Sequence, residues 1–293
     1  MATCKVVRLL GMMGSVAQND VVAALPAAAA TGVSGECEKK KKVVLFFGGD
    51  VQDFEERMLA HRDNRRHAER SLDATCALLG AKQFFRDSIV LVVRPSKMQL
   101  GTFSCFENFV RSANLGVPIY EKAPTASCHA RKLLLNSLAA LNASVGSFSQ
   151  LRLTLVGFSK GCVVLNQLAY ELEHVLAHKE FSELAEFYEA IEHWFWLDGG
   201  HNGNKDTWLT SECVLKQLAS LKNATFHVHV TPYQVEDKSR PWIGREEKKF
   251  TETLRQLGAD VNRRLHFAEM DSSIENHFRV LDVFANDVSP PST

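Results

Sequence analysis

Beyond residue 42 the chain alternates short apolar runs with longer amphipathic ones. Short continuous apolar runs are typical of strands that are buried on both faces of a parallel sheet. The amphipathic runs between them are typical of helices that cover such a sheet. The predicted strands are 43–47, 87–93, 151–156, 193–197, 226–230 and 263–267. The predicted helices are 54–79, 126–141, 162–177, 181–191, 207–221, 245–257 and 276–284. This alternation predicts an α/β fold with a mostly parallel central sheet of about six strands, flanked by helices.

The strand predicted at 151–156 runs directly into a Gly-x-Ser-x-Gly pattern. Residues 157–161 read Gly-Phe-Ser-Lys-Gly, and the helix predicted at 162–177 follows at once. A serine at such a strand-to-helix turn indicates a nucleophile elbow, in which the hydroxyl stands at the tip of a sharp turn. The bare pattern arises by chance in roughly one chain in ten of this length, so its setting between strand and helix carries the prediction. Ser159 is therefore the candidate nucleophile.

A serine nucleophile needs a general base, which is usually a histidine that a carboxylate orients. Reacting groups lie at the carboxyl ends of parallel strands, and in α/β-hydrolases the acid and then the histidine follow the serine along the chain. Asp237 and His277 each follow one of the later predicted strands. We expect Asp237 to orient His277, and His277 to act as the base. Asp198, after an earlier strand, is the alternative acid, and His201 in the same loop is the alternative base.

An acyl-transfer site also needs two donors for the oxyanion. The first is expected to be the N–H of Lys160, directly after the nucleophile. The second is expected in the loop after the first central strand, where Gly48 and Gly49 precede Asp50. Because glycine lets a backbone approach a substrate closely, we take Gly49 and Asp50 as the candidates.

Composition and charge narrow the function classes. The formal net charge is zero over 293 residues, so no global basic field points to nucleic acid. No apolar stretch reaches the roughly 18 residues that span a bilayer. Seven cysteines lie scattered without metal-ligand spacing, which favours free thiols in a reducing compartment. Neither dinucleotide-binding nor P-loop glycine motif follows a predicted strand, and we expect no cofactor and no metal.

The first 42 residues differ in composition from the rest. They are poor in acids, weakly basic and rich in alanine, which suits a mitochondrial presequence. We therefore expect a targeting, low-complexity leader over 1–42, an α/β-hydrolase-like domain over 43–286 and a flexible tail over 287–293. The cytoplasm is the alternative location.

Several blocks of this sequence resemble the eukaryotic chromosome 2 open reading frame 69 family. The matching blocks are residues 49–52, 157–168, 196–201, 230–235 and 273–280. The resemblance covers roughly 43–284 and implies an α/β-hydrolase-like fold and a location in mitochondria, where we expect the matrix. It implies no known substrate, so the site residues above rest on position and chemistry.

Two functions fit these observations. The first is a serine hydrolase that cleaves an ester, thioester or amide of a small-molecule or acyl substrate. In it, the aromatic residues at 103–109, within the irregular segment 98–124, either line an acyl pocket or pack on the surface. The alternative is a non-catalytic hydrolase fold that acts as a binding or assembly factor with protein partners.

Overall fold

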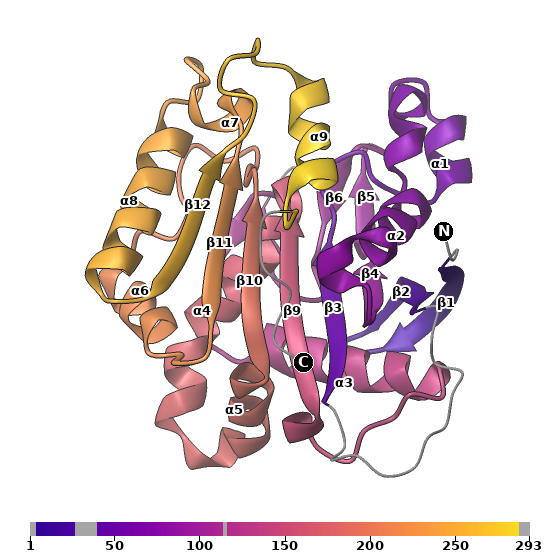
Figure 1. Cartoon of the computed structure of the whole chain (residues 1–293), viewed down its shortest axis with the longest axis vertical. Coiled ribbons are helices and arrows are strands. Elements are labelled where there is room, and N and C mark those ends of the chain that lie inside the picture. The colour runs from indigo at the N-terminus through magenta and orange to yellow at the C-terminus, as the bar shows by residue number, and fades with distance from the viewer. Residues whose placement is uncertain (1–3, 27–39, 114–115, 287–293) are drawn as a thin grey trace.

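The computed structural model describes residues 4–26, 40–113 and 116–286. Within these ranges the central sheet has eight strands, in the spatial order β1, β2, β4, β3, β9, β10, β11, β12 (Figure 1). Their bounds are Lys5–Met13 for β1, Gln18–Leu25 for β2, Lys41–Phe47 for β3, Ser88–Val93 for β4, Leu151–Phe158 for β9, Ile191–Leu197 for β10, Thr225–Val230 for β11 and Asp260–Leu265 for β12.

The six strands from β4 to β12 run parallel, and β2 runs antiparallel to both of its neighbours. These six are the strands predicted from the apolar runs. The inner ones, such as β9, are buried along almost their whole length, as a parallel sheet covered on both faces requires. A parallel sheet between helix layers, with a strand-to-helix elbow at the carboxyl end of β9, is the α/β-hydrolase-like arrangement. The predicted fold class is confirmed.

Helices cover both faces of the sheet. Buried side chains from α3, α4, α5, α6 and α8 pack on one face, and those from α2 and α9 pack on the other. The helix bounds are Glu55–Ala60 for α1, Leu72–Ala81 for α2, Thr125–Ala140 for α3, Cys162–Ala177 for α4, Ser182–Glu189 for α5, Glu212–Ala219 for α6, Pro232–Val235 for α7, Trp242–Gln256 for α8 and Ile274–Val283 for α9. No helix among the described residues is long and apolar enough to cross a membrane.

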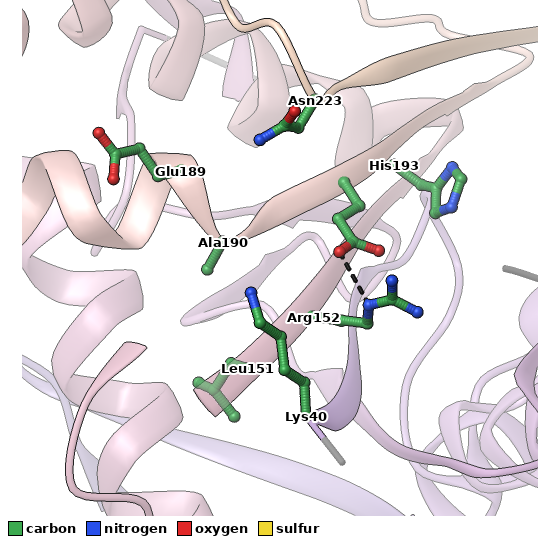
Figure 2. Close-up of a pocket in the computed structure, with 8 residues that line it drawn as sticks. Lys40, Leu151, Arg152, Glu189, Ala190, His193 and Asn223 are labelled. Atoms are coloured by element: carbon green, nitrogen blue, oxygen red, sulfur yellow. Dashed lines mark ion pairs between the residues drawn. The ribbon is translucent and has the colours of Figure 1, made fainter. Parts of the chain in front are cut away.

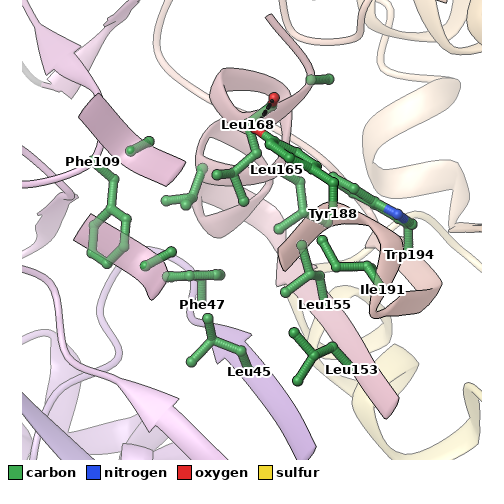
Figure 3. Close-up of a cluster of buried hydrophobic side chains, with 14 of the residues drawn as sticks. Leu45, Phe47, Phe109, Leu153, Leu155, Leu165, Leu168, Tyr188, Ile191 and Trp194 are labelled. Atoms are coloured by element: carbon green, nitrogen blue, oxygen red, sulfur yellow. Dashed lines mark hydrogen bonds between the residues drawn. The ribbon is translucent and has the colours of Figure 1, made fainter. Parts of the chain in front are cut away.

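The larger apolar core fixes the strand and helix on either side of residues 159–161. Figure 3 shows side chains of β3, β9 and β10 meeting those of α4 and α5. Leu155, Leu165 and Leu168 are fully buried there. Burial of one such leucine contributes about 1.5–3 kcal/mol, so this packing holds the turn between β9 and α4 in a single geometry.

The expected leader over 1–42 needs correction for its described part. β1 and β2 lie within this range and are integral to the sheet, since β2 pairs with β4 from Val21 to Ala24. Arg8, one of the basic residues behind the leader interpretation, is paired with Glu56 and Asp73 at 2.7 Å each. The described start of the alanine-rich stretch, Val21 to Ala24, is apolar because it belongs to an inner strand and is buried on both faces. Residues 1–3, 27–39 and the expected tail over 287–293 lie outside the described residues.

Two further expectations about local structure were wrong. The single helix predicted over 54–79 is broken into α1, a 3₁₀ segment at Asn64–Arg70 and α2, whose N-cap Ser71 accepts a hydrogen bond from Ala74 N–H. The aromatic residues Phe106 and Phe109 are neither an acyl pocket nor surface residues. They pack edge-on against Phe47 in the core, with ring centroids 5.8 and 5.2 Å away.

Four histidines lie in a row across the strands β10 and β11 and the residue after β12. His193 Nδ1 lies 3.1 Å from His227 Nε2, and His229 Nδ1 lies 2.8 Å from His266 Nε2. Burial lowers the pKa of His227 to about 2, that of His229 to about 3 and those of His193 and His266 to about 4. These imidazoles are therefore neutral in the folded protein at neutral pH.

We expect acidification from pH 7.5 to 5.5 to lower the free energy of unfolding. In the unfolded chain a histidine has a pKa near 6.5, so below that pH the unfolded state binds protons that the folded state does not. The stabilisation is complete above about pH 6.5 and is lost as the pH falls toward 4. Each histidine accounts for roughly 1 kcal/mol over this range. Urea unfolding at pH 7.5, 6.5 and 5.5 measures the effect.

A matched pair of variants tests the cause. His227→Phe, which keeps the stacking on Phe195 at 4.0 Å between ring centroids, should reduce the pH dependence. The exposed His178→Gln should leave it unchanged. Stability that stays constant between pH 7.5 and 5.5, or an equal pH slope in His227→Phe, would show that the row does not titrate in this way.

Candidate functional site

The turn between β9 and α4 presents Ser159 in a strained conformation. Ser159 has a φ of +50°, a left-handed geometry that costs a non-glycine residue about 1–3 kcal/mol. The two flanking glycines explain how the chain closes around it. A Cβ on Gly157 would lie 2.8 Å from Cys162 Cα, and a Cβ on Gly161 would lie 2.0 Å from the carbonyl oxygen of Phe47. Only hydrogen fits at either position, so the predicted elbow is present in its full steric detail.

His277 lies in the first turn of α9 and is held by Asp198. Its Nδ1 is 2.6 Å from Asp198 Oδ2, and both side chains are buried. Since an ionised carboxylate only accepts hydrogen bonds, Nδ1 carries the proton and donates it. Nε2 is then the unprotonated nitrogen, which is the tautomer that a general base requires.

Asp198 is fixed by the strand that follows it in the sheet. Directly after β10, it adopts a φ of +48°, and its two oxygens accept hydrogen bonds from Thr231 at the end of β11. The N–H of Thr231 donates to Oδ1 at 2.8 Å, and its hydroxyl donates to Oδ2 at 2.6 Å. A buried carboxylate with three donors is well satisfied in its charged form, so Asp198 can stay ionised beside the imidazole.

The preference for Asp237 as the orienting acid was therefore wrong. Asp237 Oδ1 accepts hydrogen bonds from the N–H and hydroxyl of Ser239 at 2.8 and 2.6 Å, and Oδ2 accepts one from Arg240 Nε at 2.7 Å. These partners lower the pKa of Asp237 to about 2. The segment after β11 folds into the short helix α7, and Asp237 lies in the turn after that helix. Asp198 is the acid that contacts His277.

The alternative base His201 has both ring nitrogens engaged within its own loop. Nδ1 accepts from Gly203 N–H at 2.9 Å, and Nε2 lies 3.2 Å from the carbonyl oxygen of Asp206. Burial lowers the pKa of His201 to about 4. This histidine braces the loop after β10, whereas His277 is paired with Asp198 and lines the same cavity as Ser159.

The glycine loop after β3 comes against the elbow, as expected. A Cβ on Gly49 would lie 2.9 Å from Ser159 Cβ, so glycine is needed for this approach. The N–H of Gly49, however, donates to Gln52 Oε1 at 2.8 Å. This bond corrects the role expected of Gly49 as an oxyanion donor. Gly49 acts by its small size, and the backbone N–H groups of Asp50 and Lys160 stay as candidates.

The side chain of Asp50 lines the same cavity as Ser159, and Lys160, next to Ser159 in the sequence, is buried. Burial raises the pKa of Asp50, while the nearby Lys160 and the N–H of Ser104 oppose the rise. Burial lowers the pKa of Lys160, and Asp50 opposes that fall. The two groups therefore stabilise each other's charge in a site that water reaches poorly.

Ser159 and His277 open into the same cavity, which has a volume of about 360 Å³. This size is at the lower end for small-molecule sites. The cavity lies at the carboxyl ends of the strands, where ligands bind in open α/β sheets. Its other lining residues are Asp50, Val51, Arg66, His67, Gly200, His201, Asn202, Tyr233, Gln234, Arg240, Ile274 and Phe278. Among the described residues, no group of three or more histidine, cysteine or acidic side chains is placed to hold a metal ion.

A second cavity of about 420 Å³ lies at the opposite ends of the strands (Figure 2). Its lining includes the residues where β9 and β10 begin, and two of these, Arg152 and Glu192, pair at 3.0 Å. Its lining includes no serine or cysteine nucleophile. The candidate nucleophile Ser159 lines the cavity at the carboxyl ends of the strands and not this second one.

Sequence reasoning missed the backbone strain that surrounds the site. Val51, Ser159 and Asp198 all have positive φ, between 48° and 63°, and they follow β3, β9 and β10. For a β-branched residue such as Val51 this is a rare conformation. Strain of this kind persists where the surrounding structure enforces it, and it gathers at functional sites. A sequence carries little signal for it outside the elbow motif.

Solved structures with a similar architecture include hydrolytic enzymes. An acylaminoacyl peptidase of Pyrococcus horikoshii is 10% identical with a TM-score of 0.49, covering 96% of this chain and 40% of that chain. An esterase of Rhizomucor miehei is 11% identical with a TM-score of 0.47, covering 95% of this chain and 78% of that chain. The strand order described above is sufficient to establish the fold class.

Curated relatives are much more similar in sequence. The mitochondrial protein C2orf69 homolog of Mus musculus is 37% identical over 87% of this chain and 81% of that protein. The Danio rerio homolog is 41% identical over 82% of this chain and 72% of that protein, and the Homo sapiens protein is 36% identical over 82% and 74%. The names of all three confirm the expected mitochondrial location. The C2orf69 family model matches residues 5–146 and 139–260. The chain belongs to the C2orf69 family.

Proposed function

We propose that this protein is a mitochondrial serine hydrolase that cleaves an ester, thioester or amide. The observation that carries the proposal is the 2.6 Å contact between His277 Nδ1 and Asp198 Oδ2, in a cavity that Ser159 also lines. A buried, fully satisfied carboxylate fixes the histidine in the basic tautomer. A structural histidine needs no such tautomer and no nucleophile elbow beside it.

The proposed reaction begins when Ser159 Oγ attacks the substrate carbonyl carbon and His277 Nε2 takes its proton. Asp198 stays ionised and stabilises the imidazolium that forms. The tetrahedral intermediate collapses as its bond to the leaving group breaks, and the leaving group receives the proton from His277 Nε2. Water then attacks the acyl-serine with His277 again as base. The acid product leaves, and Ser159 regains its proton.

The developing oxyanion is proposed to be held by the backbone N–H groups of Lys160 and Asp50. Lys160 follows the nucleophile at the start of the turn that leads into α4, so its N–H lies near the positive end of the helix dipole. Gly49 brings the loop of Asp50 against Ser159. One such donor is worth about 10²–10³ in kcat.

We expect a fluorophosphonate probe to label the wild-type protein and to leave Ser159→Ala unlabelled. The probe forms a covalent bond only with a serine that a base activates. Intact-mass spectrometry of the labelled protein measures the adduct. Ser220→Ala, which changes an exposed serine at the end of α6, is the matched control and should label like the wild type. Folded wild-type protein that takes up no Ser159-dependent adduct would leave a binding or assembly role instead.

A further inference from the structure

Two arginines line the cavity of Ser159, and the proposed chemistry uses neither. Arg66 comes from the 3₁₀ segment before α2, and Arg240 comes from the loop between α7 and α8. The two segments are far apart in the sequence, and both contribute an arginine to the lining of the same cavity. Guanidinium groups are suited to planar, bidentate recognition of carboxylate and phosphate groups.

Arg240 is held in place by the residue that sequence reasoning took for the catalytic acid. Its Nε donates to Asp237 Oδ2 at 2.7 Å, and Ser239 fixes the other oxygen of Asp237. The guanidinium lies 5.9 Å above the ring of Tyr233, which in turn lies 5.0 Å from the His277 ring. Arg240 is thus oriented one aromatic ring away from the candidate base.

Arg66 is also connected to His277 through a series of aromatic side chains. Its Nε donates to His67 Nε2 at 3.1 Å, and the His67 ring lies 5.1 Å from Phe278. Phe278 lies 5.7 Å from His277, with the rings edge to face. Both arginines therefore approach the candidate base through aromatic side chains, at the rim of the cavity.

The charge along the cavity wall is unbalanced. Among the described residues that line it, Asp50 is the only carboxylic acid, and burial raises its pKa. Arg66 is exposed, and the side chain of Arg240 is 29% exposed. An anionic ligand would meet two guanidinium groups among the lining residues, of which that of Arg240 is also paired with Asp237, a residue outside the lining. Such an arrangement favours anions and disfavours cations.

We propose that the substrate is an acyl ester or thioester that carries a carboxylate or phosphate group, which Arg66 and Arg240 bind while the reacting carbonyl lies at Ser159. This inference rests on the proposed hydrolase function, whose substrate class it specifies. Arg66 and Arg240 bind the substrate, and Asp237 is a positioning residue that acts through Arg240. The cavity volume of about 360 Å³ limits the substrate to a small molecule or a short acyl chain.

Matched esters test the preference. The 4-nitrophenyl monoester of glutarate carries a terminal carboxylate, its methyl-capped form is neutral, and the 4-phosphonobutyrate ester carries a phosphonate in place of the carboxylate. Butyrate esters of 4-hydroxybenzoate and of its methyl ester place the same charge in the leaving group. We expect kcat/KM to be at least about tenfold higher for one anionic ester than for its neutral partner, and to fall toward that partner in 0.5 M salt.

Substitution of the arginines should remove this preference. Arg66→Gln and Arg240→Gln should each lower kcat/KM for the preferred anionic ester about tenfold, and together about a hundredfold. The neutral esters should change less than threefold. Arg62→Gln, which changes an exposed arginine in the adjoining segment that does not line the cavity, is the matched control. An equal rate for charged and neutral esters, or a preference that survives in the double variant, overturns the proposal.

A binding measurement separates this inference from the hydrolase proposal. In Ser159→Ala, calorimetry with glutarate and with 4-phosphonobutyrate tests the anion site without turnover. Binding that is at least tenfold weaker after Arg66→Gln and Arg240→Gln supports the anion site even if no ester is cleaved. Equal binding in these variants, or none in the parent, overturns it, while wild-type protein that takes up no Ser159-dependent fluorophosphonate adduct overturns only the hydrolase function.

Discussion

Replacing Asp198 with asparagine should lower kcat/KM for Ser159-dependent ester hydrolysis by about 10⁴-fold, whereas Asp237→Asn should stay within about threefold of the wild type on a neutral ester. Asp198 is the carboxylate that contacts His277, and Asp237 contacts only its own loop among the bonds described above. The two substitutions make the same chemical change at two residues that sequence reasoning could not separate.

The large effect follows from the tautomer of His277. In Asp198→Asn, the amide oxygen can still accept from Thr231 N–H, and the NH₂ group then faces His277 Nδ1. An NH₂ group donates hydrogen bonds, so it favours the tautomer with the proton on Nε2, which cannot accept the proton of Ser159. The fold should change little because asparagine has the shape of aspartate.

Initial rates with a neutral ester such as 4-nitrophenyl butyrate, at several pH values, measure both variants. Thermal unfolding must show that each variant is folded at the assay temperature. The neutral ester matters because Asp237 positions Arg240, and a charged substrate would respond to its loss. If Asp198→Asn keeps most of the activity while Asp237→Asn loses it, the orienting acid is Asp237 and the structural assignment fails.

The elbow could be predicted from sequence because the residues that form it stand close together in the chain. Gly157 and Gly161 are required by contacts with the turn itself and with the neighbouring strand β3, and both stand at fixed spacing from Ser159. The order of strands and helices was predictable for a similar reason, since the apolar pattern of each segment indicates how that segment is buried.

The choice between the two candidate acids could not be predicted, because it depends on which strands are adjacent in the sheet. β10 pairs directly with β9, so its end lies beside the elbow, while β11 lies one strand farther out. Asp198 directly follows β10, whereas Asp237 lies beyond α7. The order along the chain does not distinguish the two candidate acids, because each of them follows the serine and precedes the histidine.

Strands β1 and β2 escaped prediction for a different physical reason. β2 is an inner strand whose buried apolar residues, Val21 to Ala24, are small, and an apolar, alanine-containing run of this kind also suits a targeting segment. Its burial results from pairing with β1 on one side and β4 on the other, and the sequence of β2 alone does not show this pairing. The ion pairs of Arg8 with the α1 and α2 region are likewise tertiary.

Gly161→Ala should destabilise the protein by about 3 kcal/mol, although intrinsic helix propensity alone favours alanine over glycine by up to about 1 kcal/mol. Gly161 has φ and ψ of −60° and −20°, which alanine adopts freely, so backbone strain plays no part. The effect is steric, because the new Cβ would lie 2.0 Å from the carbonyl oxygen of Phe47. Backbone atoms cannot move aside as a flexible side chain can.

Relief of this clash requires β3 and the start of α4 to separate. Since the loop after β3 carries Asp50 and the start of α4 follows Ser159, the same movement misplaces the proposed oxyanion donors. A displacement of about 1 Å at an active site costs on the order of 100-fold in rate, so any Gly161→Ala protein that folds should also have lost most of its activity. Urea unfolding and ester hydrolysis measure the two effects.

Gly146→Ala is the matched control, because its Cβ would meet only Gln150 Oε1 at 3.6 Å, an ordinary contact with a side chain. This variant should unfold within about 1 kcal/mol of the wild type and hydrolyse esters at the same rate. A Gly161→Ala protein as stable and active as Gly146→Ala would mean that β3 and the elbow do not pack as closely as the structure places them. The steric basis for the position of Ser159, and with it the site built on that position, would then fail.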